Sequence, residues 1–103
     1  MIIPKQFQLL GQTIVVEWDD SLVHTQDALG TTHPRENKIK LQKPNKGWGV
    51  PIEKLEHTYY HELTHWILLS MSQTELFQDE VFVDTFAGLL HQAIKSAKGE
   101  MKF

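Results

Sequence analysis

The chain has 103 residues, no cysteine and a formal net charge of −3. A chain of this length supports one hydrophobic core, so we expect a single domain over residues 1–103. A hydrophobic fraction of 41% with 22% charged residues is typical of a globular protein and excludes a disordered or fibrous one. The lack of cysteine excludes disulfides and thiolate metal sites, so any metal would be held by histidine and carboxylate. The six histidines are therefore the feature to explain.

No segment of the sequence is typical of membrane insertion or export. The longest apolar runs, residues 14–16 and 66–69, are far shorter than the roughly 20 residues of a membrane-spanning helix. Residues 1–10 include Pro4 and Lys5 and lack the apolar run of a signal peptide. We therefore expect a cytoplasmic protein that has no membrane partner.

The first half of the chain predicts strands. β-branched and aromatic residues on both sides of Gly11 and Gln12 indicate a hairpin with this pair as its two-residue turn. Residues 28–32 and 38–41 indicate a second hairpin, since the later segment alternates charged and apolar side chains. We expect a small mixed or antiparallel sheet of about four strands over residues 6–42.

The second half predicts two helices. Pro51 suits the first helical position, and helical spacing then continues to about Ser70, which predicts a helix over residues 51–70. Its apolar stripe consists of Ile52, Leu55, Tyr59, Leu63 and Trp66. Residues 72–75, Ser-Gln-Thr-Glu, have the form of a capping box and predict a second helix over residues 73–96. Its expected core positions are Phe82, Phe86 and Leu89.

These elements define the predicted fold class. It is α+β, with the small sheet packed on an αα-hairpin. Since the two helices follow each other closely, we expect them to run antiparallel.

An H-E-x-x-H segment, His-Glu-Leu-Thr-His, occupies residues 61–65 of the first helix. The i, i+4 spacing places His61 and His65 on one helix face, one turn apart, where both can bind one tetrahedral ion. Glu62 is rotated by about 100° and can reach a water instead of the ion. Two ligands and a general base follow from the spacing. The alternative is two surface histidines beside an ordinary glutamate.

A catalytic zinc site needs a third protein ligand, and the helix hairpin favours Glu80. His61 and His65 lie about 10 Å before the turn and Glu80 about 10 Å after it, at 1.5 Å per residue. Antiparallel helices would bring these three side chains level. Asp84, one turn after Glu80, can accept a hydrogen bond from the free N–H of a ligating imidazole.

Three other side chains of the second helix suit the third position less well. Glu75 lies too close to the turn, and Asp79 is rotated by about 100° from the face of Glu80. His91 lies about 16 Å further along the helix than Glu80.

The two motifs resemble those of the gluzincin metallopeptidases, the clan of thermolysin, in which HExxH on one helix is followed by ExxxD on the next. Here the matching segments are residues 61–65 and 80–84. Residues 80–90 also resemble the ImmA/IrrE-type peptidases. Residues 30–41, with Gly30 and Pro34, are similar to the rim and following strand of SprT-like and minigluzincin domains. The resemblance spans roughly residues 6–96.

The resemblance implies that His61, His65 and Glu80 bind one catalytic Zn²⁺ ion. It implies that Glu62 is the general base and acid and that Asp84 supports a zinc ligand. The implied function is a zinc metalloendopeptidase that cleaves a peptide or protein substrate with a zinc-bound water activated by the glutamate. It also implies that an exposed strand at the rim of the cleft holds an extended peptide.

Several roles stay open at this point. Larger gluzincins supply an oxyanion partner from a downstream subdomain; the candidates here are His24, His33, Tyr60 and His91. We expect His91 to pack along the helix interface. For His57 we expect a polar residue at the helix entrance, with a role at the metal or substrate as the alternative. Trp48 either closes the core or covers the cleft.

Two other functions are alternatives. A zinc-binding, peptidase-like protein without turnover would have a regulatory role. A DNA-associated protein would use the basic residues between Arg35 and Lys54, although the acidic net charge makes a nucleic-acid partner less favoured. Within the peptidase hypothesis, residues 95–103 could fold back over the cleft and make the enzyme latent. The sequence predicts no oligomeric state and no cleavage preference.

Overall fold

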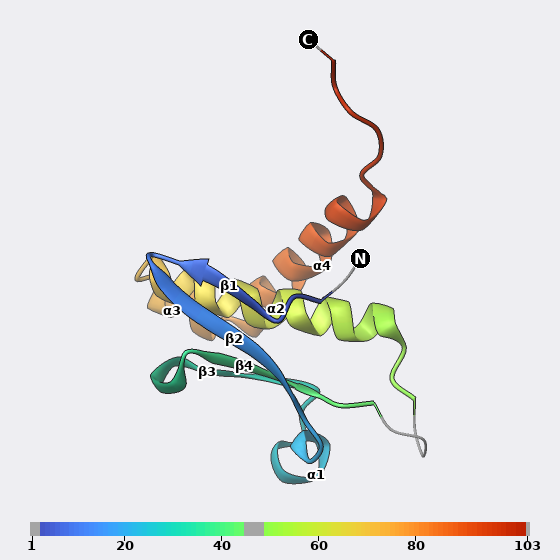
Figure 1. The fold of residues 1–103 in the computed structure, drawn as a ribbon. Helices are drawn as coiled ribbons and strands as arrows, with labels where there is room; N and C mark the ends of the chain where they lie inside the picture. The colour runs from blue at the N-terminus through green and yellow to red at the C-terminus, as the bar shows by residue number, and fades with distance from the viewer. Residues whose placement is uncertain (1–2, 45–48, 103) are drawn as a thin grey trace.

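The computed structural model of the protein describes residues 3–44 and 49–102 (Figure 1). The elements in chain order are β1 (Gln6–Leu9), β2 (Gln12–Asp19), α1 (Leu22–Gln26), β3 (Gly30–His33), a 3-10 turn at Pro34–Glu36, β4 (Lys38–Gln42), α2 (Ile52–Ser70), α3 (Thr74–Gln78) and α4 (Glu80–Ser96). A four-stranded mixed sheet and helices confirm the predicted α+β class.

The sheet has the strand order β1-β2-β4-β3. Strands β1 and β2 are antiparallel, as are β3 and β4, whereas β2 and β4 are parallel. The predicted turn of the first hairpin was one residue too late, because Gln12 already pairs with Leu9. Leu10 and Gly11 form the turn, with φ of 50° and 76°, as a two-residue hairpin turn of the primed type requires. Strand β3 lies at one edge of the sheet, beside α2.

Helix α1, which the sequence analysis did not predict, connects β2 to the edge strand β3. The Asp19 carboxylate accepts hydrogen bonds from the backbone N–H and the hydroxyl of Ser21, just before this helix. Leu22 is buried, and the side chain of Gln42 accepts a hydrogen bond from the backbone N–H of Val23. One helical turn is too short to show an amphipathic period in the sequence.

Helix α2 packs on one face of the sheet through the predicted apolar stripe. Tyr59 and Trp66 are buried in one cluster with Ile14, Ile39 and Leu41 of the sheet. The other members of that cluster are Tyr60 and Ala87. Of the remaining stripe residues, Leu55 is buried and Leu63 is half-buried, but Ile52 in the first turn is exposed.

The predicted second helix is two helices. Between α3 and α4, Asp79 has an extended backbone (φ −86°, ψ 92°), and its side chain accepts a hydrogen bond from the backbone N–H of Phe82. Asp79 therefore caps α4 and starts a new helix at Glu80. The capping-box prediction was also wrong: Ser72 has a positive φ of 58°, and Gln73, the N-cap of α3, makes no side-chain capping bond.

The expected core positions of the second helix were wrong. Phe82, Phe86 and Leu89 are 36%, 45% and 64% exposed, whereas Val83 and Ala87 are fully buried. The break at Asp79 sets the rotation of α4, so that Val83 and Ala87 turn inward. Phe82 and Phe86 instead stack on each other at the surface, with ring centroids 6.0 Å apart.

Residues 97–102 extend away from the helices and are exposed (Figure 1). They do not cover the face of α2 that carries the H-E-x-x-H segment, so the structure does not show the fold-back considered for a latent enzyme. No helix within residues 3–44 and 49–102 is long and apolar enough to cross a membrane. Trp48 and Lys46 lie outside the described residues.

Candidate metal centre

Helices α2 and α4 bring His61, His65 and Glu80 together. One ligand atom from each of these residues lies within 4.8 Å of the other two. Nε2 of His61 is 2.9 Å from Oε2 of Glu80, and Nε2 of His65 is 3.3 Å from Oε1 of the same carboxylate. Both imidazoles thus present the same nitrogen to one carboxylate.

The geometry of the triad is suitable for a metal ion. His65 is buried and His61 half-buried, while the Glu80 side chain is 67% exposed, so the set is open on one side. Two imidazole nitrogens and one carboxylate oxygen are a ligand set of catalytic zinc sites, in which a fourth position is left for water or substrate. The edge of the Phe77 ring of α3 packs against His65, with centroids 4.7 Å apart, and holds that imidazole in place.

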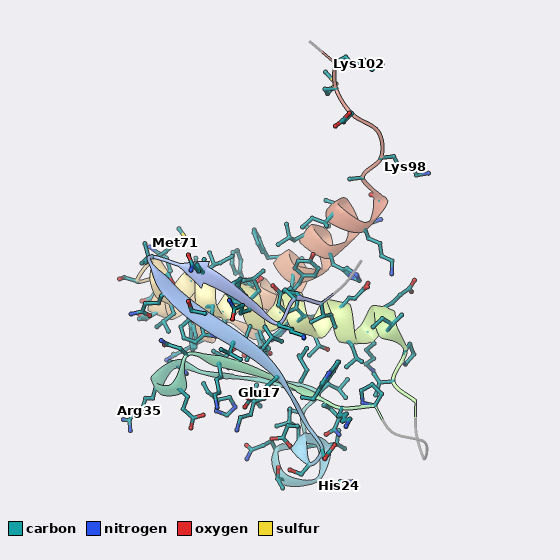
Figure 2. All side chains as sticks on the ribbon, in the orientation of Figure 1. Glu17, His24, Arg35, Met71, Lys98 and Lys102 are labelled. Atoms are coloured by element: carbon teal, nitrogen blue, oxygen red, sulfur yellow. The ribbon has the colours of Figure 1, made fainter. Side chains whose placement is uncertain are left out.

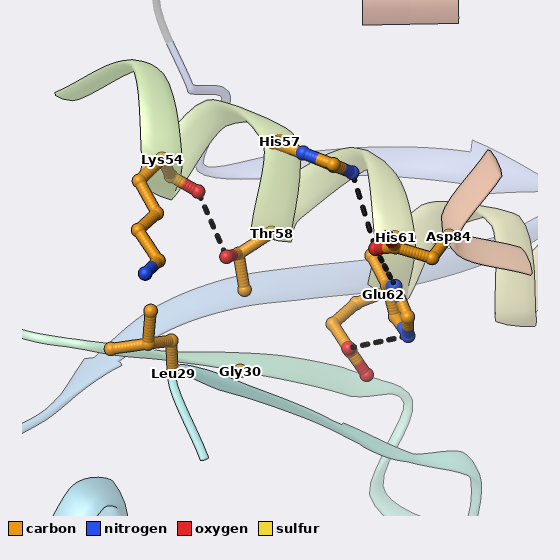
Figure 3. A pocket seen from close by; sticks show the side chains of 8 residues that line it. All are labelled: Leu29, Gly30, Lys54, His57, Thr58, His61, Glu62 and Asp84. Carbon is orange, nitrogen blue, oxygen red and sulfur yellow. Dashed lines mark hydrogen bonds and ion pairs between the residues drawn. The ribbon is translucent and has the colours of Figure 1, made fainter. Parts of the chain in front are cut away.

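Asp84 contacts two histidines of α2, His61 and His57. Its Oδ1 lies 3.1 Å from Nδ1 of His61 and 3.2 Å from Nε2 of His57 (Figure 3). A proton on Nδ1 of His61, donated to Asp84, leaves Nε2 free to bind a metal. We expected His57 to be a polar residue at the start of the helix, but it contacts Asp84. Its position one turn before His61 is the sequence feature that indicated this alternative. Gly88 of α4 faces the His57 ring, and a Cβ there would lie at an ordinary contact distance of 3.6 Å from it.

Glu62 is buried beside the triad and does not belong to it. Its Oε2 is 4.0 Å from Nε2 of His61, and its Oε1 accepts a 2.8 Å hydrogen bond from the hydroxyl of Thr32. Burial raises the pKa of the Glu62 carboxyl, while the Thr32 hydrogen bond and the nearby His61 and His65 oppose that rise. No local pattern pairs Thr32 with a residue 30 positions later, so the sequence did not predict this contact.

The edge strand β3 can approach Glu62 because residue 30 is glycine. A Cβ at Gly30 would lie 2.6 Å from Cγ2 of Thr58 and 3.2 Å from Cγ of Glu62. With any larger residue at this position, the Thr58 side chain or the strand itself would have to shift. The glycine is therefore part of the geometry of the site.

Two cavities flank the triad and share Gly30, His61 and Glu62. One has a volume of about 390 Å³ and is lined by Leu29, Gly30, Lys54, His57, Thr58, His61, Glu62 and Asp84 (Figure 3). The other has a volume of about 460 Å³ and is lined by Ala28, Gly30, Thr31, Thr32, His61, Glu62, His65, Phe77 and Glu80. Both lie between α2 and the edge strand β3, so an extended chain beside β3 would pass the triad.

None of the four candidates for an oxyanion partner lines these two cavities. His24 lies on α1 (Figure 2), and His33 lies on β3. His91 packs in the helix interface, as expected: its Nε2 is 2.9 Å from Oε1 of Glu56, and its ring stacks on Tyr60.

The described basic residues between 35 and 54 are spread over several elements, with Lys38 and Lys40 both on β4. Arg35 lies in the turn between β3 and β4 (Figure 2), and Lys38 of β4 pairs with Glu17 at 3.3 Å. Lys54 lies in the first turn of α2 and lines the smaller cavity. No described feature favours this stretch as a nucleic-acid interface.

Comparison of the chain with protein-family models, with curated proteins and with solved structures finds no match. The site is therefore interpreted from its own residues.

Proposed function

We propose that this protein is a zinc-dependent metallopeptidase of the gluzincin type, with a peptide or protein as its substrate. The observation that supports it most is the convergence of His61, His65 and Glu80 beside a buried glutamate that is not one of the three. His61, His65 and Glu80 would hold the ion. The cytoplasmic location expected from the sequence stays a prediction.

The residues around the ion have separate tasks in this proposal. A bound Zn²⁺ supplies Lewis acidity toward a carbonyl oxygen and lowers the pKa of water toward 7. Glu62 takes a proton from the attacking water and later gives it to the departing amine. Thr32 orients Glu62, and Asp84 keeps the Nδ1 proton on His61. Strand β3 lies at the edge of the sheet, where an extended peptide would pair with its backbone.

Zinc content and peptide cleavage test the proposal together. We expect the wild type to hold one zinc per chain, measured by elemental analysis, and His61→Ala and Glu80→Ala to lose it. Glu62→Gln should keep the zinc and lose cleavage of a denatured protein mixture by a factor of 100 or more, since general base catalysis typically contributes about 10²- to 10⁴-fold.

Two results would contradict the proposal. Equal zinc in the wild type and the two alanine variants would reject the ligand assignment. Stoichiometric zinc without any cleavage by the wild type would favour the alternative of a zinc-binding regulatory protein.

A further inference from the structure

The smaller of the two cavities extends from the triad toward the first turn of α2 (Figure 3). His61 and Glu62 line it at one end, and Lys54 lines it at the other. Lys54, Thr58 and His61 follow each other at helical spacing, so all three project from one face of α2. Along the helix axis, Lys54 is about 10 Å from His61.

The ammonium group of Lys54 has no neutralising carboxylate among the described residues. Within residues 3–44 and 49–102 it takes part in no ion pair, whereas Lys95 of α4 pairs with Glu53 and Glu56. The Lys54 side chain points down over the cavity beside Leu29 (Figure 3). A cation in the first turn of a helix interacts unfavourably with the helix dipole, so helix stability does not explain this residue.

The two acidic groups that line the cavity are at the other end and already have partners. Glu62 accepts the hydrogen bond from Thr32, and Asp84 lies between His57 and His61. The middle of the cavity is lined by Thr58 and Gly30, which carry no charge. An anionic group that enters near Lys54 would therefore meet a cation before it meets a carboxylate.

We propose that this cavity binds a carboxylate of the peptide substrate and that Lys54 selects it, an inference that rests on the proposed function. An extended peptide advances about 3.3 Å per residue, so a distance of about 10 Å places the carboxylate within about three residues of the scissile bond. The carboxylate belongs to an aspartate or glutamate side chain or to the C-terminus of the peptide. Both present the same group to the ammonium.

Peptide binding to the zinc-loaded Glu62→Gln protein tests this without turnover. The probes are labelled octapeptides blocked at both ends, in which Glu or Gln occupies one position at a time, together with the Gln peptide carrying a free C-terminal carboxylate. Fluorescence anisotropy gives the affinities. A Glu peptide or the free-carboxylate peptide should bind about two- to ten-fold more tightly than its neutral counterpart, with the difference shrinking at high salt.

Variants of Lys54 and of a matched lysine give the control. The preference should vanish in Lys54→Met and reverse in Lys54→Glu. It should persist in Lys98→Glu, which makes the same change of charge on the exposed C-terminal extension (Figure 2). If an internal Glu raises the affinity, the cavity binds an acidic side chain. If only the free C-terminus raises the affinity, the cavity binds a C-terminal carboxylate. Equal affinities for all peptides, or a preference that survives Lys54→Met, would overturn the proposal.

The same peptides separate this proposal from the proposed function. If the zinc-loaded wild type cleaves Glu and Gln peptides equally well, the role of Lys54 is rejected and the peptidase stands. If binding shows the preference but the zinc-loaded wild type cleaves neither these peptides nor the denatured protein mixture, the peptidase is rejected and the carboxylate site stands.

Discussion

At the scale of single residues, the candidate base is positioned by contacts from outside its own helix. Glu62 is buried between α2 and β3, and Thr32 donates to it from the edge strand. A carboxylate that abstracts a proton must be held within hydrogen-bond reach of its target, so the orientation of Glu62 matters as much as its presence. Gly30 contributes by allowing the strand to come close enough.

Replacement of Thr32 by valine tests this orientation. Thr32→Val keeps the shape of the side chain and removes the donor, so we expect peptide cleavage to fall about ten-fold or more, since a hydrogen bond to a charged group contributes roughly 1.5–3 kcal/mol. Zinc content should not change. Thr25→Val is the matched control, because the Thr25 hydroxyl donates to the backbone carbonyl of Ser21 at the start of α1 and lines neither cavity. Equal cleavage by the Thr32 variant and the wild type would remove Thr32 from the site.

At the scale of elements, a buried ion cluster joins α2 to α4 next to the candidate metal centre. The Glu56 carboxylate is buried on α2 and accepts hydrogen bonds from His91 and Lys95 of α4, each at 2.9 Å. Hydrogen bonds from His91 and Lys95 lower the pKa of the Glu56 carboxyl below its ordinary value of 4.5. These contacts help to fix the position of α4, and with it that of Glu80.

The lowered pKa of Glu56 predicts a loss of stability in acid. Because the folded state favours the charged carboxylate, its contribution to stability is complete above pH 4.5 and is lost as the pH falls through the lower pKa of the folded state. Glu56→Gln should lower the free energy of unfolding at pH 7 by about 1–2 kcal/mol. The variant should also depend less on pH below 4.5.

Urea unfolding between pH 3 and pH 7 measures this effect. Glu53→Gln is the control, since Glu53 is exposed and contacts Lys95 only at 3.4 Å. A Glu56→Gln variant with the same acid sensitivity as the wild type would contradict the assignment.

At the scale of the whole molecule, α4 is held along one side only. The radius of gyration is 14.4 Å, larger than the roughly 13 Å expected for a compact domain of this length, because the C-terminal residues project from the body (Figure 1). Phe82, Phe86 and Leu89 lie exposed on α4. A metal ion that joins α2 to α4 would therefore add a further link on the one side of α4 that packs against the rest of the protein.

Metal removal tests this contribution. A ligand that binds only the folded state stabilises it by mass action, by about 2.7 kcal/mol at 100 times its dissociation constant. For a domain of this size, we expect a chelator to lower Tm by about 10 °C or more, as measured by circular dichroism. His61→Ala and Glu80→Ala should melt at temperatures that the chelator does not change. An unchanged Tm in a wild type that had held zinc would show that the ion does not join the helices.

The sequence predicted the parts of this protein that depend on local periodicity. The limits of α2, the hairpins of the sheet and the face shared by His61 and His65 all follow from repeat spacing within one element. Glu80 and Asp84 also lie beside His61, as the sequence predicted, although α4 begins at Glu80 after the separate helix α3 and does not continue from residue 73. The predictions missed the short helix α1 and the break at Asp79. The predicted core face of α4 was wrong because the backbone rotation at Asp79 changes which side chains turn inward.

Contacts between distant segments could only come from the tertiary structure. Thr32 beside Glu62, His57 against Asp84 and Lys54 over a cavity each depend on how β3 and α4 pack on α2, and no spacing along the chain encodes that packing. The sequence by itself thus determined the α+β class and a convergent pair of histidines with a glutamate between them. The folded chain decided which groups surround them, because hydrogen bonds and cavities form wherever packing brings side chains together in space.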